Sequence, residues 1–478
     1  MTNPSSRHGA RSPSQGPRGR SASPESVAHA GPALWQQLQW VAAGLQSIRA
    51  GQSGTTAVEQ APAAWRAGVQ ALLFAVLRQL GRAEALRSQL VQRKPPAAAD
   101  ALLCSALALA WNPEGAAYEP HTLVNQTIEA AKRGAARGQA AFLNACLRRF
   151  LRERDALVAA TESDLVARWN HPAWWIARLQ ADHPDVWERI LAANNEPGPM
   201  TLRVNVKKGS VAQYQQALGA INLGAERTGD AGLILEQPVP VHRLPGFEQG
   251  SASVQDAAAQ MAAPLLLQGL DGLEGPRPLR VLDACAAPGG KTAHLLEMAP
   301  AGGLDVTALE VDGVRAERIH QNLQRLGLRA TVVVADAGDT TQWFPAWQEA
   351  QGKDVLFDAI LLDAPCTASG IVRRHPDVRW LRRESDIAQL AAQQARLLKA
   401  LWPLLQPGGR LLYCTCSVFR AEGEGQVQTF LAHNTDACLL PAPGHLIPGR
   451  DDKAGAVPDN QARDHDGFYY ALLQKKHP

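Results

Sequence analysis

Hydrophobic residues recur at helical spacing through the first part of the chain. From residue 33 onward, apolar side chains return every three or four positions, which is the period of a helix with one buried face. The first such run is Leu34, Leu38, Val41, Leu45 and Ile48, and the next is Val69, Leu72, Leu73, Val76, Leu77 and Leu80. No strand pattern appears before Phe150. The spacing predicts an all-helical domain over residues 32–172.

Two later changes of pattern predict two further domains. In residues 173–262, "MTLRVNV" and "GLILEQPVPV" have the composition of strands around the helical "VAQYQQALGAI", which predicts a small α+β linker domain. In residues 263–478, short apolar strands alternate with helical stretches, which is typical of a parallel sheet with crossover helices. The strands are "LRVLDA", "LDVTALEV", "ATVVVADA", "FDAILLDAPC" and "GRLLYCTCS". The fold class predicted is therefore multidomain, with an α/β Rossmann-like domain last.

Composition adds bounds to this picture. The 478 residues include 7 cysteines, an odd number with irregular spacing, so a reducing cytoplasm without a disulfide framework is expected. No stretch approaches the roughly twenty apolar residues of a membrane span, and the apolar run from Ala97 to Trp111 is interrupted by Asp100, which favours a buried helix. Residues 1–31 are rich in Ser, Pro and Arg and are predicted to be a disordered tail.

Basic residues gather on one predicted helix although the net charge is only +3. Around "FLNACLRRFLRERD", the apolar residues fall on one side and Arg148, Arg149, Arg152 and Arg154 on the other. Together with Lys132, Arg133 and Arg137 they form a face that favours binding of nucleic-acid phosphates. A solvated helix surface explains the same pattern, so both interpretations stay open.

The predicted parallel strands all end in groups with useful chemistry. In open α/β sheets the ligand crevice lies outside the carboxyl ends of the strands, so these groups should converge. A glycine loop follows the first strand and opens a helix, and its residues are Cys285, Ala286, Ala287, Pro288, Gly289, Gly290 and Lys291. The later strand ends carry Glu310, Asp336, Asp363, Cys366 and Cys416. Glu310 is placed to bind both hydroxyls of a ribose, which predicts an adenosine-containing cofactor of unspecified kind.

Several segments resemble motifs of a known enzyme family. "LDACAAPGGKT", "LLDAPCTASGIVRRHPDVRWLRR" and "YCTCS" are similar to the cofactor, Pro-Cys and Thr-Cys-Ser motifs of RNA cytosine-5 methyltransferases that use S-adenosyl-L-methionine. "VNQTIEAAKRGAARGQAAFLNACLRR" resembles the RNA-binding domain of the antitermination factor NusB. Their fusion is the arrangement of the small-subunit (16S) ribosomal RNA methyltransferase B family. The similarity runs from about Pro32 to the final "DGFYYALLQKK".

The resemblance implies a cofactor, a partner and roles for particular residues. It implies S-adenosyl-L-methionine held by the loop residues 285–291 with Glu310, Asp336 and Asp363, and 16S rRNA as the substrate. Cys416 is implied as the nucleophile that adds to C6 of cytosine, while Cys366 helps to remove the C5 proton. Asp363 is expected at the cytosine N3 edge or at the donor's amino-acid portion. DNA cytosine-5 methyltransferases place their nucleophile in the Pro-Cys motif, so the chemistry alone also permits Cys366.

Other residues have competing explanations. Arg373, Arg374, Arg379, Arg382 and Arg383, interleaved with Trp380, are expected to contact RNA, with a solvated surface as the alternative. Cys414 and Cys416 form a lone C-x-C, so no metal site is expected. After the Thr-Cys-Ser motif, family members usually carry Pro-Glu-Glu-Asn; this chain keeps Glu422 but has Gly423 at the Asn position, which is expected to loosen the loop.

The sequence therefore favours a monomeric, cytoplasmic enzyme that methylates C5 of a cytosine in 16S rRNA. Two alternatives remain. A methyltransferase of tRNA or another RNA would share every catalytic residue, and a non-catalytic RNA-binding assembly factor would keep the fold without the reaction.

Overall fold

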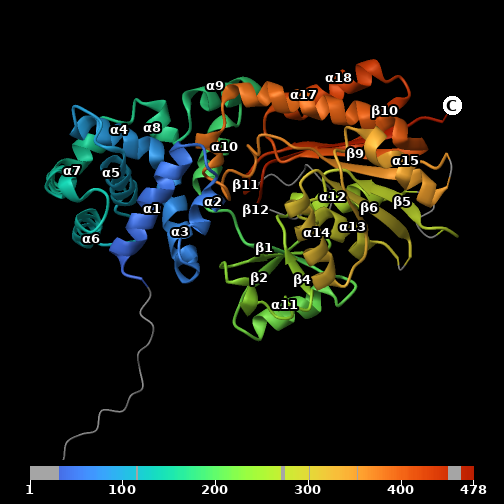
Figure 1. Cartoon of the computed structure of the whole chain (residues 1–478), viewed down its shortest axis with the longest axis horizontal. Helices are drawn as coiled ribbons and strands as arrows, with labels where there is room; N and C mark the ends of the chain where they lie inside the picture. The colour runs from blue at the N-terminus through green and yellow to red at the C-terminus, as the bar shows by residue number, and fades with distance from the viewer. Residues whose placement is uncertain are drawn as a thin grey trace, which may run out of the picture.

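The computed structural model describes residues 32–114, 117–270, 275–300, 302–352, 354–450 and 464–477. The predicted disordered tail and most of the loop "RDDKAGAVPDNQA" lie outside the described residues. Three regions follow one another along the chain (Figure 1): a helical domain, a small α+β domain and a large α/β domain. The fold class predicted from the sequence is confirmed.

The first domain is all-helical, as predicted. Its helices are α1 (Leu34–Arg49), α2 (Gly54–Glu59), α3 (Arg66–Arg78), α4 (Leu80–Leu90), α5 (Ala97–Ala110), α6 (Pro120–Lys132), α7 (Ala140–Ala159) and α8 (Leu165–Trp169). Helix α5 is mostly apolar and is buried at the centre, as its composition indicates. Asp100 on α5 is buried and ion-paired with Arg49 at 3.0 Å. None of the helices in the described ranges meets the length and hydropathy needed to cross a membrane.

The small domain has a four-stranded antiparallel sheet in the order β2-β3-β1-β4. The elements are β1 (Thr201–Val204), α11 (Val211–Gly219), β2 (Ala225–Thr228), β3 (Gly232–Leu235) and β4 (Ala252–Val254). The predictions of β1, α11 and β3 are confirmed. Strands β2 and β4 are not predicted by the sequence, because one is largely exposed and the other has only 3 residues, so neither carries a clear alternating pattern.

The large domain is built on a seven-stranded sheet in the order β10-β13-β9-β8-β5-β6-β7. Its strands are β5 (Leu279–Asp283), β6 (Leu304–Glu310), β7 (Thr331–Val334), β8 (Phe357–Asp363), β9 (Leu405–Thr415), β10 (Ala437–Leu446) and β13 (Phe468–Lys475). Strands β5 to β9 are parallel, as predicted. Two strands that the sequence analysis did not predict extend this sheet, with β13 running antiparallel between β9 and β10.

Helices cover both faces of this sheet (Figure 1). On one face lie α12 (Ala262–Leu267), α13 (Gly290–Met298) and α14 (Gly313–Leu326), and on the other lie α15 (Thr340–Gln351), α17 (Glu384–Leu401) and α18 (Glu424–His433). Each face therefore has its own apolar core, and the strand ends are left free for loops.

The segment that follows β8 joins the helical domain to the large domain. Trp380, in the short helix α16 (Val378–Leu381), packs on the helical core and donates its indole N–H to the Leu77 carbonyl at 2.8 Å. The Asp377 carboxylate accepts a hydrogen bond from the Gly54 amide at the start of α2, also at 2.8 Å. Helices α9 (Ala173–Asp182) and α10 (Trp187–Asn195) add a second apolar contact through Trp175, which packs against Phe419.

Two arginines of this segment, Arg373 and Arg379, are internal, which corrects the expectation that they contact RNA, whereas Arg383 is exposed and its expected contact stays a prediction. Arg373 and Arg379 are buried, at 3% and 0% exposure. Arg379 donates to the carbonyls of Asn170 and Asn194, so it holds the chain that leads into α9. Arg382 donates to the Thr367 carbonyl at 3.1 Å. A guanidinium whose donors are used by protein carbonyls inside the molecule is not available to phosphate.

Candidate active site

The order of the strands brings the predicted site residues to one edge of the sheet. The order of the parallel strands reverses between β5 and β8, with β6 and β7 on one side and β9 on the other. Ligands of open α/β sheets bind outside the carboxyl ends of the strands at such a reversal. The loops after β5, β8 and β9 carry the glycine loop, Cys366 and Cys416 respectively.

The two cysteines lie side by side. Strands β8 and β9 are adjacent and parallel, with Asp363 opposite Cys414, so the loops that follow them run together. The sulfur atoms of Cys366 and Cys416 lie 3.4 Å apart, and both residues are only partly buried. The hydrogen bond to Cys416, together with burial, raises the pKa of the Cys366 thiol well above its usual value. Cys366 therefore keeps its proton while Cys416 stands beside it.

Asp363 links the cysteine loops to the glycine loop. The Lys291 ammonium donates to the Asp363 carboxylate at 2.6 Å, and the Cys414 thiol donates to its other oxygen at 3.4 Å. Burial opposes the charge on Lys291, but the neighbouring Asp363 raises its pKa above the usual value, so the ammonium stays protonated. The carboxylate is 29% exposed, which leaves it accessible to a ligand at the strand ends.

The glycine loop has the shape of a cradle at a helix N-terminus. The Ala286 amide donates to the Leu309 carbonyl of β6 at 2.8 Å, which ties the loop to the neighbouring strand. Gly289 has φ 93, a backbone conformation that favours glycine, and a Cβ there would lie 3.2 Å from Ile319. Helix α13 begins at Gly290 and directs its first amides toward the strand ends. Burial raises the pKa of the Cys285 thiol, so this cysteine is an unreactive part of the loop.

Two further carboxylates follow the neighbouring strands. Glu310 ends β6 and is 3% exposed; it accepts a hydrogen bond from the Asp312 amide at 3.1 Å. Asp336 lies beyond β7 and is ion-paired with Arg396 at 3.0 Å. Asp283, at the end of β5, has one oxygen that is buried without a hydrogen-bond partner among the described residues. The glycine cradle, the buried Glu310 and the unpaired Asp283 oxygen fit a ligand with a ribose and a cationic amino-acid portion.

The small domain contacts the helix of the glycine loop. Arg203 of β1 is buried, and it donates two hydrogen bonds to the Glu297 carboxylate of α13 at 2.8 and 2.9 Å. It also donates to the Gly290 carbonyl at 2.8 Å, directly beside the cradle. The strand pattern gave no sign of this contact, because an arginine in "TLRV" is equally consistent with an exposed position.

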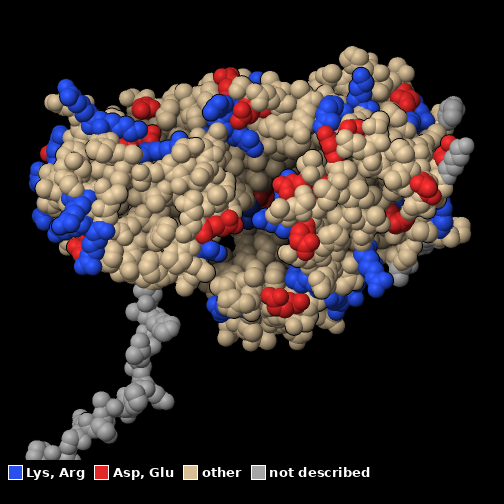
Figure 2. All heavy atoms as spheres, viewed as in Figure 1, with Lys and Arg blue, Asp and Glu red and all other residues tan. Residues whose placement is uncertain are grey.

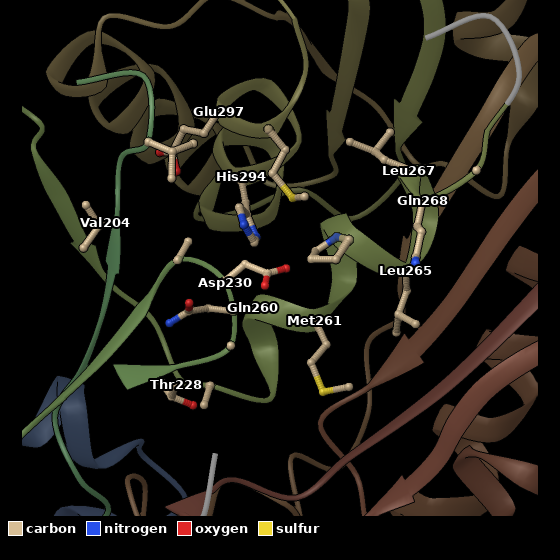
Figure 3. A pocket seen from close by; sticks show the side chains of 17 residues that line it. Val204, Thr228, Asp230, Gln260, Met261, Leu265, Leu267, Gln268, His294 and Glu297 are labelled. Carbon is tan, nitrogen blue, oxygen red and sulfur yellow. The ribbon is translucent and has the colours of Figure 1, made fainter. Parts of the chain in front are cut away.

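A separate cavity of about 610 Å³ lies between the small domain and helices α12 and α13 (Figure 3). His294 of α13 points into it, with Thr228, Asp230 and Met261 around it. Neither cysteine lines this cavity, nor does Asp363. It is therefore distinct from the strand-end site described above.

The basic face of the helical domain is on the surface, as the pattern indicated. Arg148, Arg149 and Arg152 on α7 are exposed, as are Lys132, Arg133 and Arg137. Figure 2 shows Lys and Arg side chains gathered over the end of this domain that is farthest from the large sheet. Arg149 forms an ion pair with Glu153 at 2.9 Å, so part of the charge is locally neutralised.

Comparisons with known proteins agree with this architecture. Residues 273–474 match the family described as 16S rRNA methyltransferase RsmB/F, residues 171–242 match the ferredoxin-like domain of RsmF/B-like methyltransferases, and residues 45–152 match the NusB family. The chain is 40% identical to "Ribosomal RNA small subunit methyltransferase B" of Vibrio cholerae, over 86% of this chain and 89% of that protein.

Solved structures show the same fold. The crystal structure of PH0851 has a TM-score of 0.71 at 24% identity, covering 93% of this chain and 99% of that one. A methyltransferase homolog protein from Pyrococcus horikoshii has a TM-score of 0.51 at 27% identity, covering 65% of this chain and 97% of that one.

Proposed function

The chain belongs to the RsmB/F family of 16S rRNA methyltransferases, and on that premise we propose that it methylates C5 of a cytosine in 16S rRNA through a covalent bond between Cys416 and C6. Family membership makes it an enzyme that uses S-adenosyl-L-methionine. The observation that carries the C5 chemistry is the pair of thiols 3.4 Å apart, next to Asp363 and the glycine loop.

The chemistry of cytosine explains the need for a thiol. C5 is a weak nucleophile, and addition of a thiolate to C6 converts the ring into an enamine-like species that is reactive at C5. Bound S-adenosyl-L-methionine supplies an electrophilic methyl group. The Cys416 sulfur forms the bond to C6, and after C5 has gained its methyl group the C5–H and C6–S bonds break.

The protons balance if Cys416 forms the bond to C6 and Cys366 removes the proton from C5. Cys366 releases its proton to solvent once Cys416 has left the sulfur pair to bond C6, and Cys366 then accepts the proton from C5. The cycle returns Cys366 to the thiol and Cys416 to the thiolate, with one proton released per methyl group transferred. The position of Cys366 supports this division, because its sulfur lies 3.4 Å from that of Cys416 and is therefore close to the carbon that must lose its proton.

Asp363 and Lys291 are proposed to hold the reacting groups in place. Asp363 is partly exposed and can accept a hydrogen bond from the cytosine edge or from the donor's ammonium group. Lys291 donates a hydrogen bond to that carboxylate and orients it. Residues 285–291, Glu310 and Asp336 are proposed to hold the cofactor, with Glu310 at the ribose.

RNA must present an unstacked base to this site. Enzymes that act on a ring atom extrude the base from its helix, so a flipped cytosine is expected beside Cys416. We propose that the exposed arginines of the NusB-like domain bind phosphates of the same RNA. We also propose that the chain works as a monomer in the cytoplasm, which sedimentation of the purified protein and fractionation of cells would test.

The test is nucleoside mass spectrometry after incubation with methyl-labelled S-adenosyl-L-methionine. Unmodified 16S rRNA, tRNA and DNA are compared, and labelled 5-methylcytidine is expected in the 16S rRNA alone. Cys416→Ala should abolish turnover and adduct formation, while Cys366→Ala should accumulate a protein–RNA adduct that survives denaturation. An adduct recovered only from the Cys416 variant would reverse the roles, and label in tRNA would favour the alternative substrate.

A further inference from the structure

One buried carboxylate lies beneath both cysteine loops. Glu422 is fully buried in the turn after β9. One of its oxygens accepts hydrogen bonds from the Thr367 amide at 2.9 Å and from the Gln394 amide group at 3.2 Å. The other accepts from the Thr367 hydroxyl at 2.5 Å and the Ser417 hydroxyl at 2.7 Å. Both oxygens of this carboxyl group are therefore engaged in two hydrogen bonds each.

The two hydroxyl donors are the residues that directly follow the two cysteines. Thr367 follows Cys366, and Ser417 follows Cys416. Each thiol is therefore one peptide unit away from a group held by the same carboxylate. Burial raises the pKa of Glu422, and the hydrogen bonds from Ser417 and Thr367 oppose that rise. A buried carboxyl group bonded to both loops fixes them relative to each other.

The turn that carries Glu422 is itself fixed. Its backbone carbonyl accepts a hydrogen bond from the Tyr413 hydroxyl at 2.7 Å. A Cβ at Gly423 would lie 2.7 Å from both His445 and Tyr469, so the next position is packed closed. The expectation that Gly423 loosens this loop stays a prediction, to be weighed against this close packing. His445 and Tyr469 pack against Gly423 and occupy the space next to the position at which family members carry an Asn side chain.

We propose that Glu422 is a positioning residue that sets the separation of the Cys366 and Cys416 sulfurs. Its hydrogen bond to the Ser417 hydroxyl (the Ser417 arm) and its hydrogen bond to the Thr367 hydroxyl (the Thr367 arm) each serve a different step of the reaction. The inference rests on the proposed covalent mechanism. The Ser417 arm holds Cys416 for addition to C6, and the Thr367 arm holds Cys366 for removal of the C5 proton. Glu422 itself touches neither sulfur nor substrate.

Single-turnover kinetics can separate the two arms. Ser417→Ala should slow formation of the covalent adduct roughly 10- to 100-fold, because a misplacement of about 1 Å costs rates of that order. Thr367→Val should leave formation near the wild-type rate and slow release by a similar factor, so that adduct accumulates. Thr367→Ser keeps the hydroxyl and should restore release. Glu422→Gln, which nearly preserves shape, should slow both steps.

Controls distinguish positioning from loss of structure. Thr429→Val removes the hydroxyl of an exposed residue of helix α18, which donates to the Gly425 carbonyl, and should change neither step. S-adenosyl-L-methionine affinity and melting temperature are measured for every variant, and cofactor affinity should stay within about twofold of wild type because the glycine loop is not touched.

The outcomes are distinct. Equal slowing of both steps by Ser417→Ala and by Thr367→Val, or wild-type rates in both variants, would overturn the positioning role. Failure of the wild-type protein to form any adduct would instead overturn the covalent mechanism itself. The predicted split between formation and release is not expected from a merely structural hydrogen bond.

Discussion

Two sets of arginines in this chain look alike in the sequence and differ in the structure. Those on α7 are exposed at the outer end of the NusB-like domain. Among those that follow the Pro-Cys loop, Arg379 and Arg373 are enclosed, at 0% and 3% exposure, and only Arg383 is fully on the surface. The first set is free to meet phosphates, whereas the second joins the domains together. A run of basic residues in a sequence therefore indicates only charge. The residues packed around it in the fold decide whether it binds an external partner or bonds groups of the same chain.

The surroundings come from distant parts of the sequence. Arg379 bonds residues 184 to 209 positions away, and Arg374 bonds Asp256 at a separation of 118. Local spacing cannot reveal such acceptors. The exposed set needs no distant partner, since its neighbours on α7 are Asn144 and Glu153 at helical spacing.

The largest expected effect is on stability, from Arg379→Met. The substitution keeps most of the volume but leaves the carbonyls of Asn170 and Asn194 and the side-chain oxygen of Asn195 without this donor. A buried unpaired acceptor costs about 1–3 kcal/mol, so a loss of roughly 3 kcal/mol or more is expected in urea unfolding. An unchanged unfolding midpoint would show that Arg379 does not stabilise the contact between the domains. It would remove the difference proposed between the enclosed and the exposed arginines.

The next effect should depend on pH. Arg374 bonds Asp256 at 2.8 Å and pairs with the buried Asp466, whose pKa burial raises to about 7. A raised pKa stabilises the folded state at low pH, and that stability is lost as pH rises through the folded value. Arg374→Ala removes a cation that lowers this pKa, so the variant should lose more stability at pH 8 than at pH 6.

We expect a loss of about 3 kcal/mol for Arg374→Ala at pH 8, because removing one partner leaves a buried charge uncompensated. Unfolding curves at the two pH values measure it. The control is Arg374→Ala combined with Asp466→Asn, which should remove most of the pH dependence. A loss that is equal at both pH values would contradict the assignment to Asp466.

The smallest effect on stability should come from the exposed set. Arg148→Ala combined with Arg152→Ala should leave the free energy of unfolding within about 0.5 kcal/mol of wild type for each substitution. Binding of 16S rRNA should weaken, and the slope of log affinity against log salt should fall by about 1 for each phosphate that the variant no longer binds. Arg227→Ala, on an exposed strand of the small domain, is the matched control. Unchanged affinity and slope would assign these arginines to a solvated surface.

The sequence predicts the parts of the fold that depend on local pattern. Strands β5 to β9 and the helical domain follow from hydrophobic periodicity, and the thiols and carboxylates lie at strand ends as their positions in the sequence indicate. The antiparallel β13 is not predicted, because "FYYALLQK" is buried on both faces and carries no sign of its direction. The roles of Glu422 and Arg203 could not be predicted from the sequence, since both depend on partners brought close only by the tertiary fold.

The contact between α16 and the helical domain bears on how the chain is made. The hydrogen-bond partners of Gly54 and Leu77 are synthesised much later. Asp377 follows Gly54 by 323 residues, and Trp380 follows Leu77 by 303. At about 5–20 residues per second, the ribosome needs on the order of 15 to 60 s to deliver them. During that interval the surface of the nascent NusB-like domain that α16 covers has no partner. The helical domain and the large domain can therefore dock only after the chain has been synthesised past β8.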